Sequence, residues 1–169
     1  AFSGCKNLVI AEFEMSGKSF GSSAFRDVTI ETLKISGEVK TESSSWDSGT
    51  LYGAVIGKVK LKDGLEVISS SLFRDCTSIK EVKLPGTVTE IGNNAFDGCT
   101  GLKGISIPKS VKKIGSNAFN GCTGFTSVSI PESVETIGSY AFYGCTGITS
   151  VDIPDSVKTI EAGAFSGCK

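Results

Sequence analysis

Cysteine is the residue type in this chain whose spacing most invites chemistry. The 169 residues include six cysteines, which would suit either disulfides or a thiolate metal site. One thiol per interval at a constant phase predicts a ladder of buried cysteines that pack as small apolar groups. Disulfides between neighbouring intervals are the alternative, and a metal site is disfavoured because the sequence has no C-x-x-C motif and no histidine. Five of the cysteines recur every 23 residues, at Cys76, Cys99, Cys122, Cys145 and Cys168.

Other motifs of catalytic chemistry are incomplete. Gly17-Lys18-Ser19 matches the end of a phosphate-binding loop, but Glu12 stands where that motif requires its first glycine. The absence of histidine removes the commonest general base, and the carboxylates occur singly at varied phases of the interval. We therefore expect no enzymatic activity, no metal and no cofactor.

The overall charge gives no general attraction to nucleic acid or to an anionic membrane. Lysine and arginine total 17 and aspartate and glutamate total 18, for a formal net charge of -1. No stretch approaches the roughly 18 apolar residues that span a bilayer, and no basic-then-apolar start predicts a signal peptide. We therefore predict neither nucleic-acid binding nor a membrane span.

The elements that must position these residues follow the same 23-residue period. Phenylalanines recur at this interval from Phe73 to Phe165, and isoleucines and prolines recur likewise. One unit, residues 144–166, reads G-C-T-G-I-T-S-V-D-I-P-D-S-V-K-T-I-E-A-G-A-F-S. A period of this length indicates a solenoid of stacked coils.

The N-terminal part carries a worn copy of the repeat and a slip in register. Phe2 and Phe25 are 23 residues apart, but Leu33 and Val59 are 26 residues apart. The slip is centred on the polar stretch 40–52. We therefore predict an irregular coil near residues 40–58, with the register restored from Val59 onward.

Within each repeat, alternating apolar residues predict one short strand. In one unit these residues are Val151 and Ile153, and stacking such strands about 4.8 Å apart gives a parallel sheet along one face. Pro154 ends the strand because it has no amide hydrogen to donate. A second apolar piece predicts a brief extended segment on another side of the coil. Ser139 is expected to cap a single helical or 3-10 turn, which Gly144 ends.

The pattern C-x-x-L-x-x-V-x-I-P-x-x-V-x-x-I-G-x-x-A-F-x-G resembles the BspA-like subclass of leucine-rich repeats, strongly from Val59 onward and weakly before it. The resemblance implies an α/β repeat: a right-handed leucine-rich-repeat solenoid, strand-rich with short helical or 3-10 turns and a parallel sheet on one face. We expect residues 1–169 to form one such domain of about seven coils. The same six residues, A-F-S-G-C-K, open and close the chain, so we expect a fragment of a longer array.

Two sets of surface residues are candidates for binding. The outward strand positions are small or polar, and they form either plain solvated sheet or a protein-binding face. The polar stretch adds Trp46, Asp47 and Tyr52 as anchors in an irregular loop, although Trp46 equally suits the phenylalanine position of that coil. The outward strand positions are Glu81, Lys83, Gly104, Ser106, Ser127, Ser129, Ser150 and Asp152.

The resemblance also implies where the protein acts. Members of the BspA-like family are typically secreted or surface-anchored adhesion proteins, implied in binding host matrix and plasma proteins such as fibronectin and fibrinogen. An extracellular protein-binding module is therefore the leading expectation. The alternatives are a structural spacer with no ligand of its own and a carbohydrate-binding accessory module centred on Trp46, Asp47 and Tyr52. Uncapped coil ends also predict end-to-end self-association.

Overall fold

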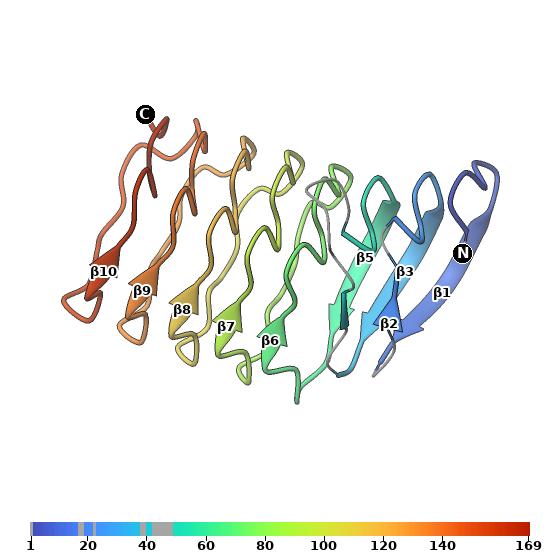
Figure 1. Cartoon of the computed structure of the whole chain (residues 1–169), viewed down its shortest axis with the longest axis horizontal. Coiled ribbons are helices and arrows are strands. Elements are labelled where there is room, and N and C mark those ends of the chain that lie inside the picture. The colour runs from blue at the N-terminus through green and yellow to red at the C-terminus, as the bar shows by residue number, and fades with distance from the viewer. Residues whose placement is uncertain (1, 17–18, 22, 38–39, 42–48) are drawn as a thin grey trace.

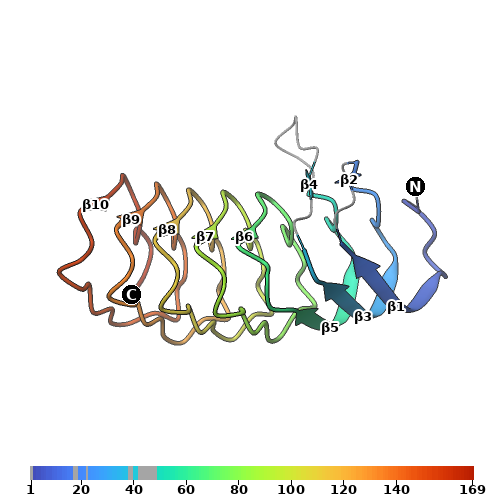
Figure 2. The same ribbon diagram turned by 90° about the horizontal axis from the view of Figure 1, so that it is seen from below.

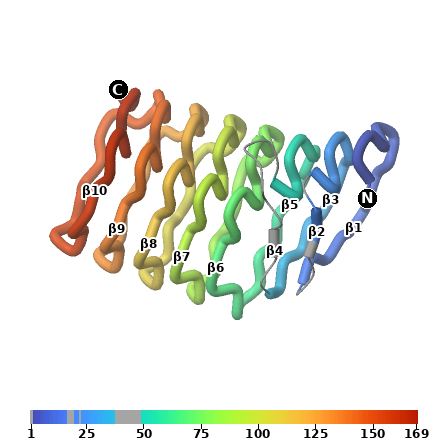
Figure 3. Tube along the Cα trace, in the orientation of Figure 1, coloured from blue at the N-terminus to red at the C-terminus, as the bar shows by residue number. Residues whose placement is uncertain are grey.

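Parallel pairing between successive coils arranges the chain as a stack, with the two termini at opposite ends (Figure 1). The computed structural model describes residues 2–16, 19–21, 23–37, 40–41 and 49–169. The Cα trace shows the coils following one another side by side along the stack (Figure 3). The parallel solenoid predicted from the repeat is thus confirmed.

The N-terminal coils form a three-stranded parallel sheet. It contains β1 (Val9–Met15), β3 (Thr29–Ile35) and β5 (Val55–Leu61), in the order β1-β3-β5. Leu33 pairs with Val59, as the 26-residue spacing predicted. Because these two residues stay in register, the extra residues are accommodated outside the sheet.

A second set of strands runs along another side of the stack, where the sequence predicted only a brief extended segment. Two-residue strands pair in the order β10-β9-β8-β7-β6, and β2 pairs with β4. Figure 2 shows these strands above the row formed by β1, β3 and β5. The strands are β2 (Ser19–Phe20), β4 (Lys40–Thr41), β6 (Val67–Ile68), β7 (Glu90–Ile91), β8 (Lys113–Ile114), β9 (Thr136–Ile137) and β10 (Thr159–Ile160).

The strand predicted in each later coil does not form. Val151 and Ile153 lie in a segment that continues the face of β1, β3 and β5 but carries no strand. Within the described ranges, the pairing of the later coils on this face is an isolated parallel bridge between Lys83 and Ser106. The sheet on this face therefore ends at β5, and β6 to β10 carry the strand pairing of the later coils.

The predicted helical turn is replaced by tight turns whose amides are shared between two coils. The part of the chain that the structure describes contains no helix. The amides of Ala118 and Asn120 donate to carbonyls three residues back, whereas those of Asn117, Phe119 and Gly121 donate to the next coil. A helical turn would use all of these amides for its own carbonyls. Asn117 and Gly121 also have φ of 54° and 67°, outside the range of a right-handed helix.

Ser139 joins two coils instead of capping a helix. Its hydroxyl and its amide donate to one carboxylate oxygen of Glu161, at 2.8 and 2.9 Å. These two hydrogen bonds lower the pKa of Glu161. The amide of Ser116 donates in the same way to Oδ1 of Asn93 in the coil before it, at 2.9 Å. Polar side chains at this position therefore satisfy amides between neighbouring coils.

A ladder of phenylalanine rings fills the core. From Phe73 to Phe165, neighbouring ring centroids lie 5.1 to 5.3 Å apart and the ring planes differ by 4° to 14°. Stacking of this kind adds about 0.5–1.5 kcal/mol per pair to the burial itself. In the coil before Phe73, the position is filled by Leu51, which is fully buried. Leu51 therefore takes the place proposed for Trp46, which itself lies outside the described residues.

The cysteine ladder lies beside these rings, as predicted. Each thiol from Cys76 onward donates to the carbonyl of the ring-position residue one coil back, at 3.0 to 3.3 Å. Burial raises the pKa of Cys99 and of Cys145 to about 12. Val28 and Ala54 take the same position in two N-terminal coils, where both are buried. The position therefore selects for small size and an apolar surface.

Thiol labelling tests this ladder. Treating the native protein with dithionitrobenzoate at mildly alkaline pH is expected to modify the exposed Cys5 first and the half-buried Cys168 more slowly. The four buried thiols are expected to react only after unfolding in urea, because burial blocks the reagent and disfavours the thiolate. Rapid modification of any of these four in the native protein, located by mass spectrometry, would contradict the ladder. The buried thiols are Cys76, Cys99, Cys122 and Cys145.

Candidate interaction surface

Lysines dominate the outer face of the three-stranded sheet. The sequence K-V-K-L-K at the end of β5 places Lys58, Lys60 and Lys62 outward, because side chains alternate along a strand. Lys34 on β3 pairs in register with Lys60. Like charges directly opposite each other on a sheet are destabilising. Stability therefore does not explain why lysines gather on this face.

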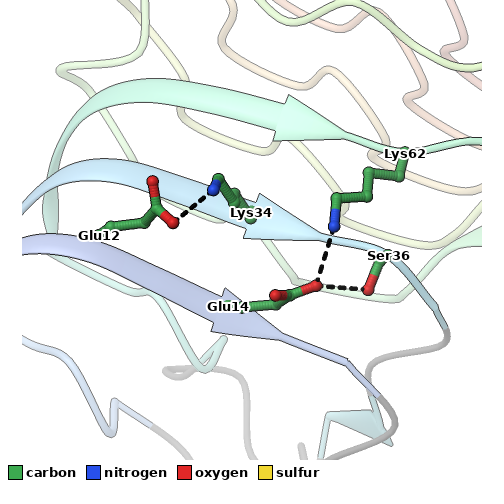
Figure 4. Close-up of polar contacts among 5 residues, drawn as sticks. All are labelled: Glu12, Glu14, Lys34, Ser36 and Lys62. Carbon is green, nitrogen blue, oxygen red and sulfur yellow. Dashed lines mark hydrogen bonds and ion pairs between the residues drawn. The ribbon is translucent and has the colours of Figure 1, made fainter.

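Two of these lysines are paired with acids on β1. The amino group of Lys34 contacts Glu12, and that of Lys62 lies 3.2 Å from Oε1 of Glu14 (Figure 4). The hydroxyl of Ser36 also donates to Glu14, at 2.8 Å. The hydrogen bonds from Ser36 and Lys62 lower the pKa of Glu14, and the charge of Lys62 adds to the effect. Because these side chains are largely exposed, the pairs contribute little to stability.

The remaining lysines of the face have no acidic partner. Among the described residues, Lys58, Lys60 and Lys83 form no ion pair. Lys83 is exposed on the coil after β5, beside the exposed Glu81. The face therefore changes from acidic at β1 to basic at β5 and the following coil.

A cleft of about 720 Å³ separates β5 from the coil that follows it. Before the cleft, the hydroxyl of Ser78 accepts from the amide of Ile56 at 2.7 Å and donates to its carbonyl at 3.2 Å. After the cleft, the hydroxyl of Thr87 accepts from the amide of Gly64 at 3.1 Å and donates to the carbonyl of Leu65 at 2.8 Å. The cleft is lined by Val59, Lys60, Leu61, Lys62, Asp63, Lys83, Leu84 and Pro85.

The outward strand positions predicted from the sequence do lie at the surface. Among them, Lys83 lines the cleft, whereas Asp152 lines a separate hollow of about 300 Å³ with Glu132 and Asp155. The structure therefore joins Lys83 to the lysines of β5 and leaves the serines as a separate neutral strip. The exposed predicted residues are Glu81, Lys83, Ser106, Ser127, Ser129, Ser150 and Asp152, and Gly104 is half-buried.

Tyr52 lies in the turn before β5, on a row of polar side chains that holds one position per coil. The guanidinium of Arg26 lies over the Tyr52 ring, 5.7 Å from its centroid. Further along the row, Arg74 lies 3.1 Å from Asp97, which accepts a hydrogen bond from Asn120 at 2.9 Å. Burial raises the pKa of Asp97. Tyr52 is therefore held by its neighbour in the row and does not line the cleft.

The residues that distinguish this surface were largely missed from the sequence. The predicted anchors Trp46 and Asp47 lie outside the described residues. The predicted strip began at Glu81, whereas the basic face begins one coil earlier, at Lys58 and Lys60. Its signal was the strict alternation of K-V-K-L-K at residues 58–62, which is the period of a strand with one solvated side.

The described surface offers no sign of a metal site. Among the residues that the structure covers, no group of three or more histidine, cysteine, aspartate or glutamate side chains could hold a metal ion. No helix in the described part of the chain is long and apolar enough to cross a membrane. The basic face and its cleft are instead the features that set this surface apart.

Comparisons with known proteins agree with the architecture. The model of the BspA type leucine rich repeat region matches in six copies, over residues 1–46 and 44–169. A leucine rich repeat protein from T. pallidum superposes with a TM-score of 0.68 at 23% identity, covering 86% of this chain and 71% of that chain. A leucine-rich repeat protein from Bacteroides ovatus has a TM-score of 0.72 at 27% identity, covering 94% of this chain and 43% of that one. Among curated proteins, no sequence matches this chain.

The substitution Ser78→Ala tests the hydroxyl bridge that borders the cleft. It is expected to lower the free energy of unfolding by about 1–3 kcal/mol, because the amide and carbonyl of Ile56 both lose their partner. Urea denaturation followed by circular dichroism measures the change. The control Ser127→Ala removes an exposed hydroxyl from the same face and is expected to change stability by less than about 0.5 kcal/mol. Equal effects of the two substitutions would contradict the role of Ser78.

Proposed function

The chain belongs to the BspA-type leucine-rich-repeat family, and from this premise we propose that it is a protein-binding module of a secreted or cell-surface protein. Its binding face is the lysine-rich outer face of β3 and β5, continued by Lys83. The partner presents an acidic surface. The observation that carries the proposal is the group of lysines without acidic partners, Lys58, Lys60 and Lys83, on one side of a sheet.

Local geometry makes this face suited to recognition. The chain as a whole has a formal net charge of -1, so the basic face is a local concentration of charge. The strand backbones fix its lysines about 4.8 Å apart across the sheet. Complementary charge on a fixed surface accelerates encounter and selects between partners. A rigid basic face therefore favours an acidic protein surface.

Extracellular proteins such as fibronectin and fibrinogen are the proposed partners, and the family resemblance is the reason for naming them. The basic face supports the choice only through its charge. The chain spans less than half the length of the Bacteroides ovatus protein that it resembles. The partners of the whole protein are therefore proposed on the same terms as those of this chain.

Surface-plasmon resonance with immobilised fibronectin and fibrinogen tests the proposal. The wild-type chain is expected to bind at least one of them saturably, and added salt is expected to weaken binding because exposed charges are screened. The double substitution Lys58→Glu/Lys60→Glu is expected to weaken binding by about tenfold or more, because it reverses the charge of the face.

The matched control reverses the same number of charges elsewhere. Lys109→Glu/Lys112→Glu changes two exposed lysines outside the three-stranded sheet and is expected to bind as the wild type does. Loss of binding in both variants would show an effect of net charge alone and would count against the face. Absence of wild-type binding to either protein would favour the spacer interpretation.

A second copy of the chain is another proposed partner. In the last coil, Ile153 and Ile160 are 39% and 48% exposed, and β10 pairs with β9 alone. Exposed apolar side chains beside a free strand edge favour pairing with another strand. Sedimentation velocity over a range of concentrations is expected to show a rising average mass. A monomer at every concentration would rule out end-to-end association.

A further inference from the structure

The edge of β5 that faces the cleft has backbone groups without partners. The amide of Lys62 donates to the carbonyl of Ile35, at 2.8 Å, on the β3 side. Because backbone groups alternate in direction along a strand, the amides and carbonyls of Val59 and Leu61 point the other way, toward the cleft. Both coils are fully described here, and no hydrogen bond joins Val59 or Leu61 to residues 83–85.

The neighbouring coil does not close this edge because its own pairing lies on the other side. Lys83 forms its bridge with Ser106 of the coil beyond. The contacts that tie the two walls together run through the hydroxyls of Ser78 and Thr87, at the borders of the cleft. An unpaired strand edge therefore lies inside the stack, bounded at both ends.

The chemistry of the lining indicates what this edge would accept. Val59, Leu61, Leu84 and Pro85 give the cleft an apolar part, and both Val59 and Leu61 are partly exposed to it. Its charged residues are three lysines and one aspartate, Lys60, Lys62, Lys83 and Asp63. The cleft volume of about 720 Å³ falls in the range typical of ligand sites, roughly 300–1,000 Å³.

We infer that this cleft binds an extended, acidic peptide segment of the partner protein. The inference rests on the proposed function, and it names the part of the partner that the face recognises. The main chain of the segment pairs with the free amides and carbonyls of Val59 and Leu61, as in strand addition to a sheet edge. Its alternate side chains, aspartate or glutamate, meet Lys60 and Lys83, and the residues between them contact the apolar lining.

An extended segment fits these observations better than a helix does. A helix satisfies its own backbone groups and would leave the amides of Val59 and Leu61 unpaired. An added strand offers them carbonyls and amides at the same repeat as β5. The strand also places every second side chain on one side, which matches the outward spacing of the lysines.

A short peptide that alternates glutamate with threonine, capped at both ends and labelled with a fluorophore, is the probe. Fluorescence anisotropy with the full chain is expected to show saturable binding that added salt weakens. Two altered probes accompany it: the same peptide with alternate backbone amides methylated, and a peptide that replaces each glutamate with lysine. Both are expected to bind about tenfold more weakly or worse, because each loses one of the two kinds of contact.

Two substitutions in the chain separate backbone pairing from charge. Val59→Pro removes the amide that faces the cleft, and proline is tolerated on an edge strand whose amide faces solvent. Its matched control, Val59→Thr, keeps the amide and the branched side chain. Lys83→Glu reverses one charge on the far wall. We expect about tenfold weaker peptide binding for Val59→Pro and for Lys83→Glu, and little change for Val59→Thr.

Amide hydrogen exchange locates the peptide even if the proline variant fails to fold. Adding the peptide to the wild-type chain is expected to slow exchange at Val59 and Leu61 by about tenfold, because a hydrogen-bonded amide must open before it exchanges. The amide of Lys60, which faces β3, is expected to change little. Binding that leaves Val59 and Leu61 unprotected, or that the folded Val59→Pro variant retains in full, would overturn the inference.

Failure of this inference and failure of the proposed function give different results. Binding of fibronectin or fibrinogen that the Lys58→Glu/Lys60→Glu variant loses, without any binding of the acidic peptide, overturns the cleft and leaves the protein-binding face. Peptide binding with protection of Val59 and Leu61, without binding of either plasma protein, supports the cleft and overturns the named partners.

Discussion

Backbone hydrogen bonds between successive coils are the interaction on which the rest of the structure depends. The amides of Asn117, Phe119 and Gly121 donate to the next coil at 2.7 to 2.8 Å, and the same arrangement recurs along the stack. Each coil thereby holds its neighbour in register, so side chains at one phase of the repeat must stack. The phenylalanine rings and the buried thiols follow from this constraint, because a single repeat cannot bury its apolar side alone.

The cleft marks the place where this interaction changes sides. Up to β5, long strands carry the pairing on one face, and beyond β5 the short strands β6 to β10 carry the strand pairing on another. At the boundary, the hydroxyls of Ser78 and Thr87 take over the bonding between the two coils. The edge of β5 between them is left without a partner. Solenoids normally hide strand edges except at their ends, so an internal edge is a distinctive surface.

Charge on the outer face varies freely because these positions do not enter the core. Acids on β1 neutralise Lys34 and Lys62, whereas Lys58, Lys60 and Lys83 carry unpaired charge. The serines further along the stack keep the later coils neutral on this face. The face therefore combines a repeated scaffold with a local chemistry that does not repeat.

The sequence by itself determined the repeat, the phases of the phenylalanine and cysteine ladders and the register between Leu33 and Val59. Those features are visible in one dimension because core positions must match from coil to coil, which makes their spacing periodic. Tertiary structure alone decided which side of each coil carries strands, that the turns are not helical, and that Lys83 meets the lysines of β5 across a cleft. These outcomes depend on how neighbouring coils compete for the same backbone amides, and that competition leaves no periodic trace in the sequence.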